Sequence, residues 1–461
     1  MKTRDWWLMI SVGLGILLNP LNSSMISVAI PRLQQVFQLD FTAVSWIIFS
    51  FYLASAVAQP VMGKASDVFG RRPLFLTGLV VAFLASLAAP FCPSFGWLIV
   101  TRVVQSVGTS MMTAVGMAIV RVHITEKQAV ALSVLALFLS GAAAFGPFVG
   151  GLLVHWWDWR AIFVVNLPFT LASFLLAWKM IPKDGDAASA RPRYSFRQWM
   201  SKMDVPGIAL FAAGLVALLA GLLSAKSTGQ FSSVQALTGL AGVVLLIAFV
   251  RRELKTAVPF IPLRTFAKYP AMTWVNLEFL LVNVLFYAVF FGLPSYLQAV
   301  RQLDEFHTGI LMLSLGLCSL AAAPPAGRWI EKSGPGPALF LSAILMTVGA
   351  VWLVTLSPTS PVVSVCVALA AFGVSNGLNS VGMQAALFQS TPKEIIGVAS
   401  GLFNTSRYLG TILSSLLTGL VMGGQFSFQG FRVLGMILTA IALLLVFMNL
   451  RRRKAEIQVE R

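Results

Sequence analysis

The sequence predicts an all-α membrane protein that crosses the bilayer many times, and three observations lead to this class. The chain has 461 residues, of which 57% are hydrophobic and 11% are charged, whereas a soluble globular protein carries about 25% charged residues. The apolar residues lie in long uninterrupted segments, and the basic residues lie mostly between alternate pairs of these segments. A water-soluble fold of this size is excluded because the polar residues that would cover its surface are missing.

The cysteines and histidines give no sign of a disulfide framework or a metal centre. Cys92, Cys318 and Cys366 are scattered over apolar stretches, and the three histidines show no ligand spacing. The phosphate-binding pattern G-x-x-x-x-G-K-[ST] does not occur, so ATP is not expected as the energy source. We therefore expect no cofactor, no metal and no enzymatic activity.

The membrane spans are predicted from segment length, since a helix crosses ~30 Å of hydrocarbon with roughly 20 apolar residues. Lys2 and Arg4 precede the first segment, but its apolar run is too long for a signal peptide, so we interpret it as an uncleaved helix. The fourteen predicted spans are Trp7–Ile30, Thr42–Met62, Leu74–Phe91, Phe95–Val120, Ala129–Val154, Ala161–Met180, Val205–Ala225, Val234–Val250, Ala271–Leu297, Thr308–Ile330, Ala338–Leu356, Val362–Ala385, Ile396–Gly423 and Phe431–Leu450.

The distribution of positive charge predicts the orientation. The net charge is +17, with 33 Lys and Arg against 16 Asp and Glu. With the N-terminus inside, 26 of the basic residues face the cytoplasm and five face outside, while Arg102 and Arg407 lie within spans. This asymmetry follows the positive-inside rule and predicts that both termini are cytoplasmic. The basic charge is thus explained by topology, and no nucleic-acid partner is expected.

Two basic cytoplasmic segments divide the chain into two halves and an insert. The expected parts are a first six-helix half (1–180), a basic linker (181–203), two inserted helices (204–250), a second linker (251–270), a second six-helix half (271–450) and a basic tail (451–461).

An internal repeat supports this division. The chain reads Gly63-Lys-Ala-Ser-Asp67-Val-Phe-Gly70-Arg71-Arg72-Pro73 after the second span and Gly327-Arg-Trp-Ile-Glu331-Lys-Ser-Gly334-Pro335 after the tenth. In both, an acid follows a glycine by four residues and another glycine comes three residues later. Parallel repeats of this kind are typical of transporters whose substrate site lies near the bilayer midplane.

At these motifs the chain resembles the major facilitator superfamily, and within it the fourteen-span drug:proton antiporter family. Gly63, Asp67, Gly70, Arg71 and Arg72 match the loop motif of the superfamily. The resemblance implies a charged cluster that latches the cytoplasmic helix ends in one state of the transport cycle. The alternative is a solvated charged turn.

The fourth span holds Arg102, Gln105, Ser106 and Gly108, similar to the family pattern R-x-x-Q-G-x-G with serine in place of one glycine. An arginine within a span costs about 2.5–3.5 kcal/mol on insertion scales, so it should face protein or water. The resemblance ties this arginine to proton transfer, and a structural pair between helices is the alternative.

The fifth span holds Gly141, Gly146, Pro147, Gly150 and Gly151, which resembles the antiporter motif G-x-x-x-x-G-P-x-x-G-G. Small residues allow helices to approach closely, and proline interrupts the hydrogen bonds of the helix. The family carries this motif in exporters, so the resemblance implies outward transport. Ordinary small-residue packing is the alternative.

The chain departs from the family at its acids. Asn22 stands where the family usually has an aspartate in the first span, and an amide does not titrate near neutral pH. Glu278 is the only acid within a predicted span, which makes it a candidate for proton coupling. On a helical wheel it points about 160° away from Asn283 and Tyr287, so a structural pair with a neighbouring helix is the alternative.

Other polar residues within the spans outline a candidate substrate cavity, although hydrogen bonds between helices are the alternative for each. With two arginines and at most one acid, this cavity suits neutral amphipaths or anions better than dications. The cavity candidates are Asn19, Asn22, Gln105, Asn283, Tyr287, Asn376, Asn404 and Arg407.

Together these features predict a secondary transporter of the bacterial cytoplasmic membrane, a proton-coupled exporter of drug-like or amphipathic small molecules. Its two halves would alternate access to a midplane site. The expected partners are a small-molecule substrate, protons and the lipid bilayer, and we expect a monomer. The alternative is an exporter of an endogenous anionic or neutral metabolite with weak or no proton coupling.

Overall fold

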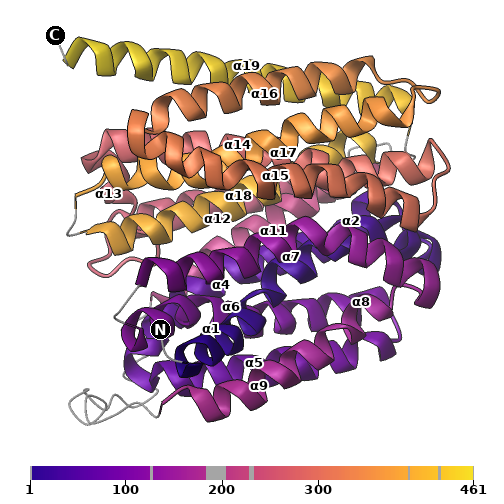
Figure 1. Ribbon diagram of the computed structural model, residues 1–461. Helices are drawn as coiled ribbons and strands as arrows, with labels where there is room; N and C mark the ends of the chain where they lie inside the picture. The colour runs from indigo at the N-terminus through magenta and orange to yellow at the C-terminus, as the bar shows by residue number, and fades with distance from the viewer. Residues whose placement is uncertain are drawn as a thin grey trace.

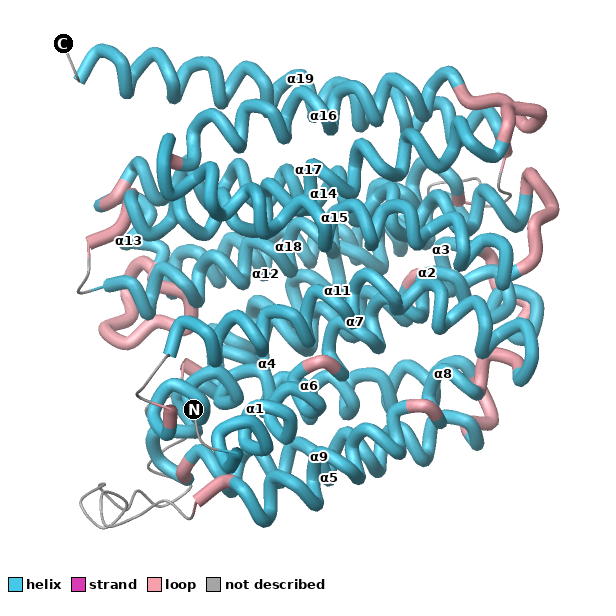
Figure 2. The backbone as a smooth tube through the Cα atoms, in the orientation of Figure 1, coloured by secondary structure: helices cyan, strands magenta, loops and turns pink. Residues whose placement is uncertain are grey.

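The computed structural model describes residues 3–124, 128–182, 204–227, 233–392, 395–423 and 427–459, and these residues form helices and connections with no strand. The helices run nearly side by side as one bundle (Figure 1), and most connections lie at its two ends, with short non-helical breaks inside it, as Figure 2 shows. Both chain termini lie at the same end, on the left of Figure 1. We call this end the termini side and the opposite end the far side. The prediction of an all-α fold is confirmed.

The first half of the bundle crosses between these two ends six times. Asp40 starts the second crossing, because its carboxylate accepts a hydrogen bond from the backbone N–H of Ala43 at 2.7 Å and caps the helix start. The helices of this half are α1 (Thr3–Ile16), α2 (Leu18–Phe37), α3 (Phe41–Val44), α4 (Trp46–Phe69), α5 (Arg71–Ala88), the 3-10 helix η1 (Ala89–Phe91), α6 (Phe95–His123), α7 (Gln128–Trp157), α8 (Ala161–Val164) and α9 (Asn166–Met180).

The second half follows after the insert and the short α13 (Leu263–Lys268). Asp304 caps its second long helix in the same way, by accepting from the backbone N–H of His307 at 2.7 Å. The last helix continues to Val459, so the basic tail predicted at 451–461 is helical over 451–459. The helices of this half are α14 (Pro270–Ala299), α15 (Glu305–Ser333), α16 (Pro335–Thr355), α17 (Val362–Gln389), α18 (Ile396–Met422) and α19 (Phe428–Val459).

The two inserted helices, α11 (Val205–Ser227) and α12 (Ser233–Glu253), form a close pair. A Cβ at Gly221 would lie 2.5 Å from the Cα of Gly239, so the two backbones nearly touch. α11 contacts α18 of the second half and also α3 and α4 of the first half. α12 exposes apolar side chains such as Val234 and Leu237, which suits contact with lipid. The predicted linker 181–203 falls almost wholly outside the described residues.

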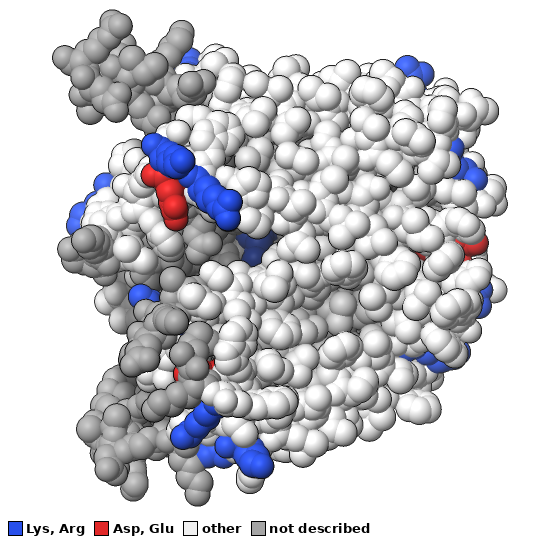
Figure 3. All heavy atoms as spheres, in the orientation of Figure 1, with Lys and Arg blue, Asp and Glu red and all other residues white. Residues whose placement is uncertain are grey.

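Length and composition support many membrane crossings. Thirteen stretches of the described residues are long and apolar enough to span a bilayer, and α18, with 27 residues, occupies the thirteenth predicted segment. On the face drawn in Figure 3, charged side chains gather toward the two ends and leave an uncharged belt between them.

The repeated motif forms the same turn in both halves. Gly70 separates α4 from α5 with φ 94°, and Gly334 separates α15 from α16 with φ 70°. A positive φ is strained for a residue with a Cβ and easy for glycine. The spacing that is repeated within the chain therefore marks two equivalent helix-to-helix turns.

Candidate functional site

Three helix pairs make the main contacts between the two halves: α7 with α15, α4 with α18, and α2 with α14. On the far side these pairs are in direct contact. Gln298 Nε2 donates a hydrogen bond to the backbone oxygen of Val28 at 3.0 Å. His155 Nδ1 lies 4.0 Å from Glu305 Oε2. The halves are therefore closed against each other at this end.

The glycine motif of α7 packs first against α2 of its own half. A Cβ at Gly146 would overlap Ser24 Oγ, and a Cβ at Gly150 would lie 2.7 Å from the backbone oxygen of Met25. Ser24 Oγ also donates to the backbone oxygen of Ala142 at 3.2 Å. The small residues thus permit a helix approach that larger side chains would prevent.

The opposite face of the same motif packs against α15 of the other half. A Cβ at Gly151 would overlap the backbone oxygen of Glu305, and a Cβ at Gly309 would lie 2.9 Å from the backbone oxygen of Pro147. Gly316 meets Ala144 in the same close way. The motif therefore lies where the two halves are pressed together, whereas a Cβ at Gly141 would meet nothing within 4 Å.

On the termini side the halves are separate. Gly63 of α4 and Gly401 of α18 both have open space where a Cβ would lie. Figure 3 shows a hollow between the halves near this end, with a basic side chain visible in it. The bundle thus has an interior that is closed at the far side and open at the termini side.

The loop motif lies at the open end. Arg72 Nη2 donates to the backbone oxygen of Trp178 at 2.7 Å, and its guanidinium lies 5.7 Å from the centre of the Trp178 ring. Arg71 is partly exposed. The side chain of Asp67 falls outside the part of the structure that is described. Arg72 therefore binds within its own half in this state.

A polar network lies inside the first half, around Arg102. This side chain is 1% exposed, and its Nη1 donates to Gln105 Oε1 at 2.8 Å. Gln105 Nε2 donates in turn to Asn22 Oδ1 at 3.1 Å and to Ser86 Oγ at 2.8 Å. Asn166 Nδ2 donates to the same Asn22 oxygen at 2.8 Å. Asn22 is therefore the acceptor at which α2, α6 and α9 meet, and Gln105 connects α5 to them through Ser86.

Arg102 has aromatic rather than acidic neighbours. Its guanidinium carbon lies 4.3 Å from the centre of the Phe51 ring and 5.9 Å from that of Phe163. Its Nε makes no hydrogen bond, and no described carboxylate lies within 4.0 Å of it. Cation–π contact and amide hydrogen bonds together hold this charge.

A second polar group lies where α4, α14 and α18 meet, midway along the bundle. The ring centre of Tyr52 lies 5.8 Å from that of Tyr287 and 6.0 Å from that of Tyr408. Arg407 lies beside them, with Nη2 3.3 Å from the Tyr408 hydroxyl oxygen, to which it donates. We call these four residues the tyrosine cluster. It combines one residue of the first half with three of the second.

Glu278 lies away from the interface between the halves. It is 4% exposed, and Asn449 Nδ2 of α19 donates to its Oε1 at 2.6 Å. Asn276, two residues earlier, faces α18 instead and accepts a hydrogen bond from Ser406 at 3.0 Å. Glu278 and Asn276 thus point to different neighbours of α14, namely α19 and α18.

Among the other cavity candidates, some form hydrogen bonds within or between helices and one is partly exposed. Asn19 donates to Thr109 at 3.2 Å and Asn376 to Ser319 at 2.9 Å, each across a helix pair. Asn283 donates within its own helix to Phe279 at 2.7 Å. Asn404 is partly exposed on α18.

Tyr52 and Tyr408 were not among the site residues predicted from the sequence, although their rings meet in the structure. The chain has only six tyrosines, and three of them meet in the tyrosine cluster although they are far apart along the chain. Their positions within predicted spans were visible in the sequence. Which face of each helix would point inward was not, because the apolar residues surround those helices on all sides.

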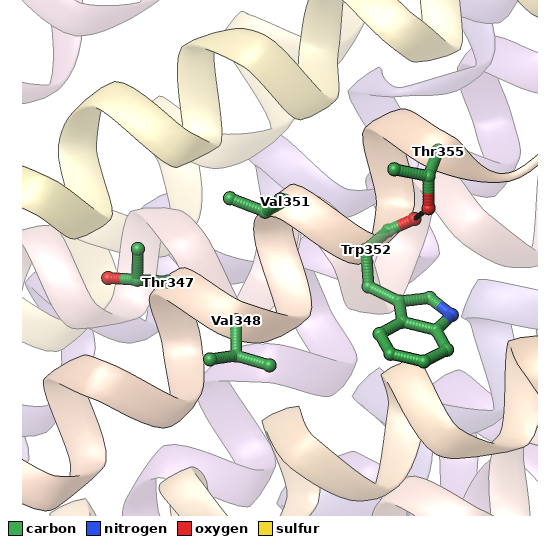
Figure 4. A pocket seen from close by; sticks show the side chains of 5 residues that line it. All are labelled: Thr347, Val348, Val351, Trp352 and Thr355. Atoms are coloured by element: carbon green, nitrogen blue, oxygen red, sulfur yellow. Dashed lines mark hydrogen bonds between the residues drawn. The ribbon is translucent and has the colours of Figure 1, made fainter.

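A shallow groove on α16 is a different feature. Its lining residues Thr347, Val348, Val351, Trp352 and Thr355 lie along one face of that helix, and the Thr355 hydroxyl donates to the backbone oxygen of Trp352 at 2.7 Å (Figure 4). The lining is almost wholly apolar and exposed. This groove lies on the outer surface of the bundle and has no connection to the tyrosine cluster.

The chain is similar to known proteins over nearly its whole length. A sequence model of the Major Facilitator Superfamily matches residues 12–415 and 305–461. YwoD of Bacillus subtilis (strain 168), an uncharacterized transporter of the same type, is 44% identical over 93% of this chain and 92% of its own length. A tetracenomycin C resistance and export protein of Streptomyces glaucescens is 28% identical over 92% of this chain and 77% of its own.

The fold has a counterpart among solved structures. The nucleoside transporter NupG superimposes with a TM-score of 0.69, covering 97% of this chain and 99% of its own, at 10% sequence identity. At that identity the likeness concerns the fold alone.

Proposed function

The chain belongs to the major facilitator superfamily, whose members are membrane transporters rather than enzymes, and from this premise we propose that it exports drug-like or amphipathic small molecules from the bacterial cytoplasm. The halves rock about the midplane, so that the substrate enters from the termini side and leaves at the far side. The termini side is the cytoplasmic one by the distribution of Lys and Arg.

One observation carries this proposal. The far side is closed by contacts between the halves, such as Gln298 to Val28, whereas the termini side is open, and the tyrosine cluster lies between the two ends with residues from both halves. A binding site shared by two rocking halves is what alternating access requires. Export is supported by the glycine motif of α7 and by the similarity to the Streptomyces resistance and export protein.

We further propose that export is coupled to protons and that Glu278 carries them. It is a buried acid inside a predicted span, and because burying such a group costs free energy, acids at this depth mark functional sites. Its amide partner Asn449 holds either protonation state, because an amide both donates and accepts. Arg102 is the second candidate for coupling.

The test uses everted membrane vesicles with a respiration-driven proton gradient, to which neutral, anionic and cationic compounds are added. We expect some compounds to collapse the gradient in the wild type and to lose this effect in Glu278→Gln. Asp5→Asn, at an acid in the first turn of α1 and outside the motifs, is the control and keeps the effect. Substrate movement without any collapse contradicts proton coupling.

A second candidate function is an exporter of an endogenous anionic or neutral metabolite with weak or no coupling. Asn22 favours it, because an amide occupies the hydrogen-bonded position next to Gln105 where the family usually has a titrating acid. In the vesicle experiment this candidate predicts substrate movement with an unchanged proton gradient. We expect the protein to act as a monomer in either case.

A further inference from the structure

The tyrosine cluster contains a positive charge that is accessible inside the bundle. Arg407 lies midway along α18 and is partly exposed. Its guanidinium interacts with Tyr408, Tyr287 and Tyr52, and because Tyr52 belongs to the other half, Arg407 lies at the interface between the halves. Arg102, the other arginine within a span, is 1% exposed and hydrogen-bonded to Gln105, so a substrate reaches Arg407 first.

Arg407 has unused hydrogen-bonding capacity. A guanidinium carries five N–H donors, and one hydrogen bond is formed, to the Tyr408 hydroxyl at 3.3 Å. No carboxylate of the described residues lies within 4.0 Å of it. A positive charge at this depth is stabilised by an anion, and a guanidinium binds a carboxylate with two parallel hydrogen bonds.

Two further donors nearby are also unused. Tyr52 is 4% exposed, and its hydroxyl has no hydrogen-bond partner. Gln59, two turns later on α4, has a buried amide nitrogen without a partner. A buried polar group without a partner costs free energy, so a bound acceptor group at this place is favoured.

The remaining walls of the cluster are aromatic. Tyr287 stacks on Phe291 with ring centres 5.6 Å apart, and Tyr52 lies edge-on to both rings, with ring centres 5.8 Å and 6.4 Å away. Flat apolar groups pack well against such faces. The cluster therefore offers a cationic end and an aromatic wall within one site.

We propose that this site binds aromatic carboxylates, with the carboxylate on Arg407 and the Tyr52 hydroxyl and the aromatic body against Tyr287. The assignment rests on the proposed transport function and names the charge of the cargo. Tyr52 belongs to the first half and Arg407 to the second, so the bound carboxylate connects the two halves while they move.

The test measures binding by titration calorimetry on the purified full-length protein in detergent. The probes are 2-naphthoate, the neutral 2-naphthamide and the cationic 2-naphthylmethylamine, which share one aromatic body. We expect the carboxylate to bind at least about tenfold more tightly than the other two. In Arg407→Gln the naphthoate affinity falls at least about tenfold while the naphthamide affinity is unchanged, and Arg407→Lys recovers part of it. Tyr52→Phe weakens naphthoate binding about threefold.

The matched control is Arg432→Gln, which removes an exposed arginine at the start of α19 and leaves naphthoate binding unchanged. Monodisperse elution and an unchanged melting temperature of each variant verify folding. Absence of naphthoate binding in the wild type, tighter binding of the amine, or equal naphthoate affinity in Arg407→Gln each overturns the proposal.

Failure of the site and failure of the proposed function give different results. If vesicles export neutral or cationic amphipaths while Arg407→Gln binds naphthoate as tightly as the wild type, the proposed carboxylate site is contradicted and the export function stands. If naphthoate binds through Arg407 but no compound of the panel moves across the vesicle membrane, the site stands and the export function is wrong.

Discussion

Asn22 Oδ1 accepts a hydrogen bond from Gln105 Nε2 at 3.1 Å, and Gln105 accepts in turn from Arg102 at 2.8 Å. The Gln105 amide thus connects a buried guanidinium to Asn22. The oxygen of Asn22 also accepts from Asn166 at 2.8 Å. A carboxylate fits the same two donors, so the network is compatible with a titrating group that this chain does not have.

The first prediction is that Asn22→Asp strengthens proton coupling by adding a second titrating group to the transport path. The new carboxyl keeps the acceptor role toward Gln105 and Asn166, and a nearby arginine stabilises its charged form. Collapse of the proton gradient per substrate added to everted vesicles should increase at least about twofold, and transport should become more dependent on pH. Asn19→Asp is the matched control, because Asn19 lies on the same helix but contacts Thr109 instead. An equal response of the two variants contradicts the prediction.

The second prediction concerns the contact between the halves at Gly151. A Cβ there overlaps the backbone oxygen of Glu305 in α15, and since backbone does not yield as a flexible side chain does, the helices must separate. Gly151→Val should open the far side and reduce transport at least about tenfold. The distance between spin labels on the far-side ends of α7 and α15 measures this directly.

Gly141→Val is the matched control for this experiment. It lies in the same motif, but a Cβ at this position meets nothing within 4 Å. It should leave the spin-label distance unchanged. If both variants change the distance equally, helix propensity and not the contact between halves is responsible.

The third prediction concerns the inserted helices. A Cβ at Gly207 in α11 would overlap Asp204 Oδ2 and lie 2.7 Å from Glu253 Oε1 of α12. These carboxylates are buried, and Asp204 pairs with Arg252 at 2.8 Å. Gly207→Ala should therefore disturb this pair and destabilise the junction by about 1–3 kcal/mol, seen as a lower melting temperature. Gly239→Ala, whose Cβ has its nearest neighbour at 3.8 Å, should change it little, and an equal loss contradicts the prediction.

The helical architecture was largely predictable from the sequence, because a bilayer requires long apolar segments and excludes most other folds. The residues at which each helix begins and ends were less predictable. The first predicted span, Trp7–Ile30, lies within the longer helical stretch Thr3–Phe37. Helices continue beyond the apolar segment, since polar residues at the membrane surface are also helical. The turns at Gly70 and Gly334 were visible as a repeat because glycine is needed at positive φ.

The candidate site was only partly predictable. Arg407 and Tyr287 were identified from their polarity within spans, whereas their partner Tyr52 was not. The partner of Glu278 could not be predicted either, because Asn449 is 171 residues away along the chain. Which helices become neighbours depends on packing between the halves, and no pattern within one segment records it.

The last prediction is a pH dependence at the far side, where Arg32 Nε lies 2.7 Å from Asp158 Oδ1. Partial burial opposes ionisation, but hydrogen bonds from Arg32 and the Trp159 backbone hold the pKa of Asp158 below its ordinary value. This pair stabilises the fold above the unfolded pKa of about 3.9, and the contribution is lost as pH falls through the lower folded pKa. Asp158→Asn tolerates the positive φ of 67° at this position and should cost roughly 0.5 kcal/mol at pH 7, since both side chains are partly exposed. The difference in melting temperature from the wild type should shrink toward pH 3, and a difference that is constant between pH 7 and pH 3 contradicts the assignment.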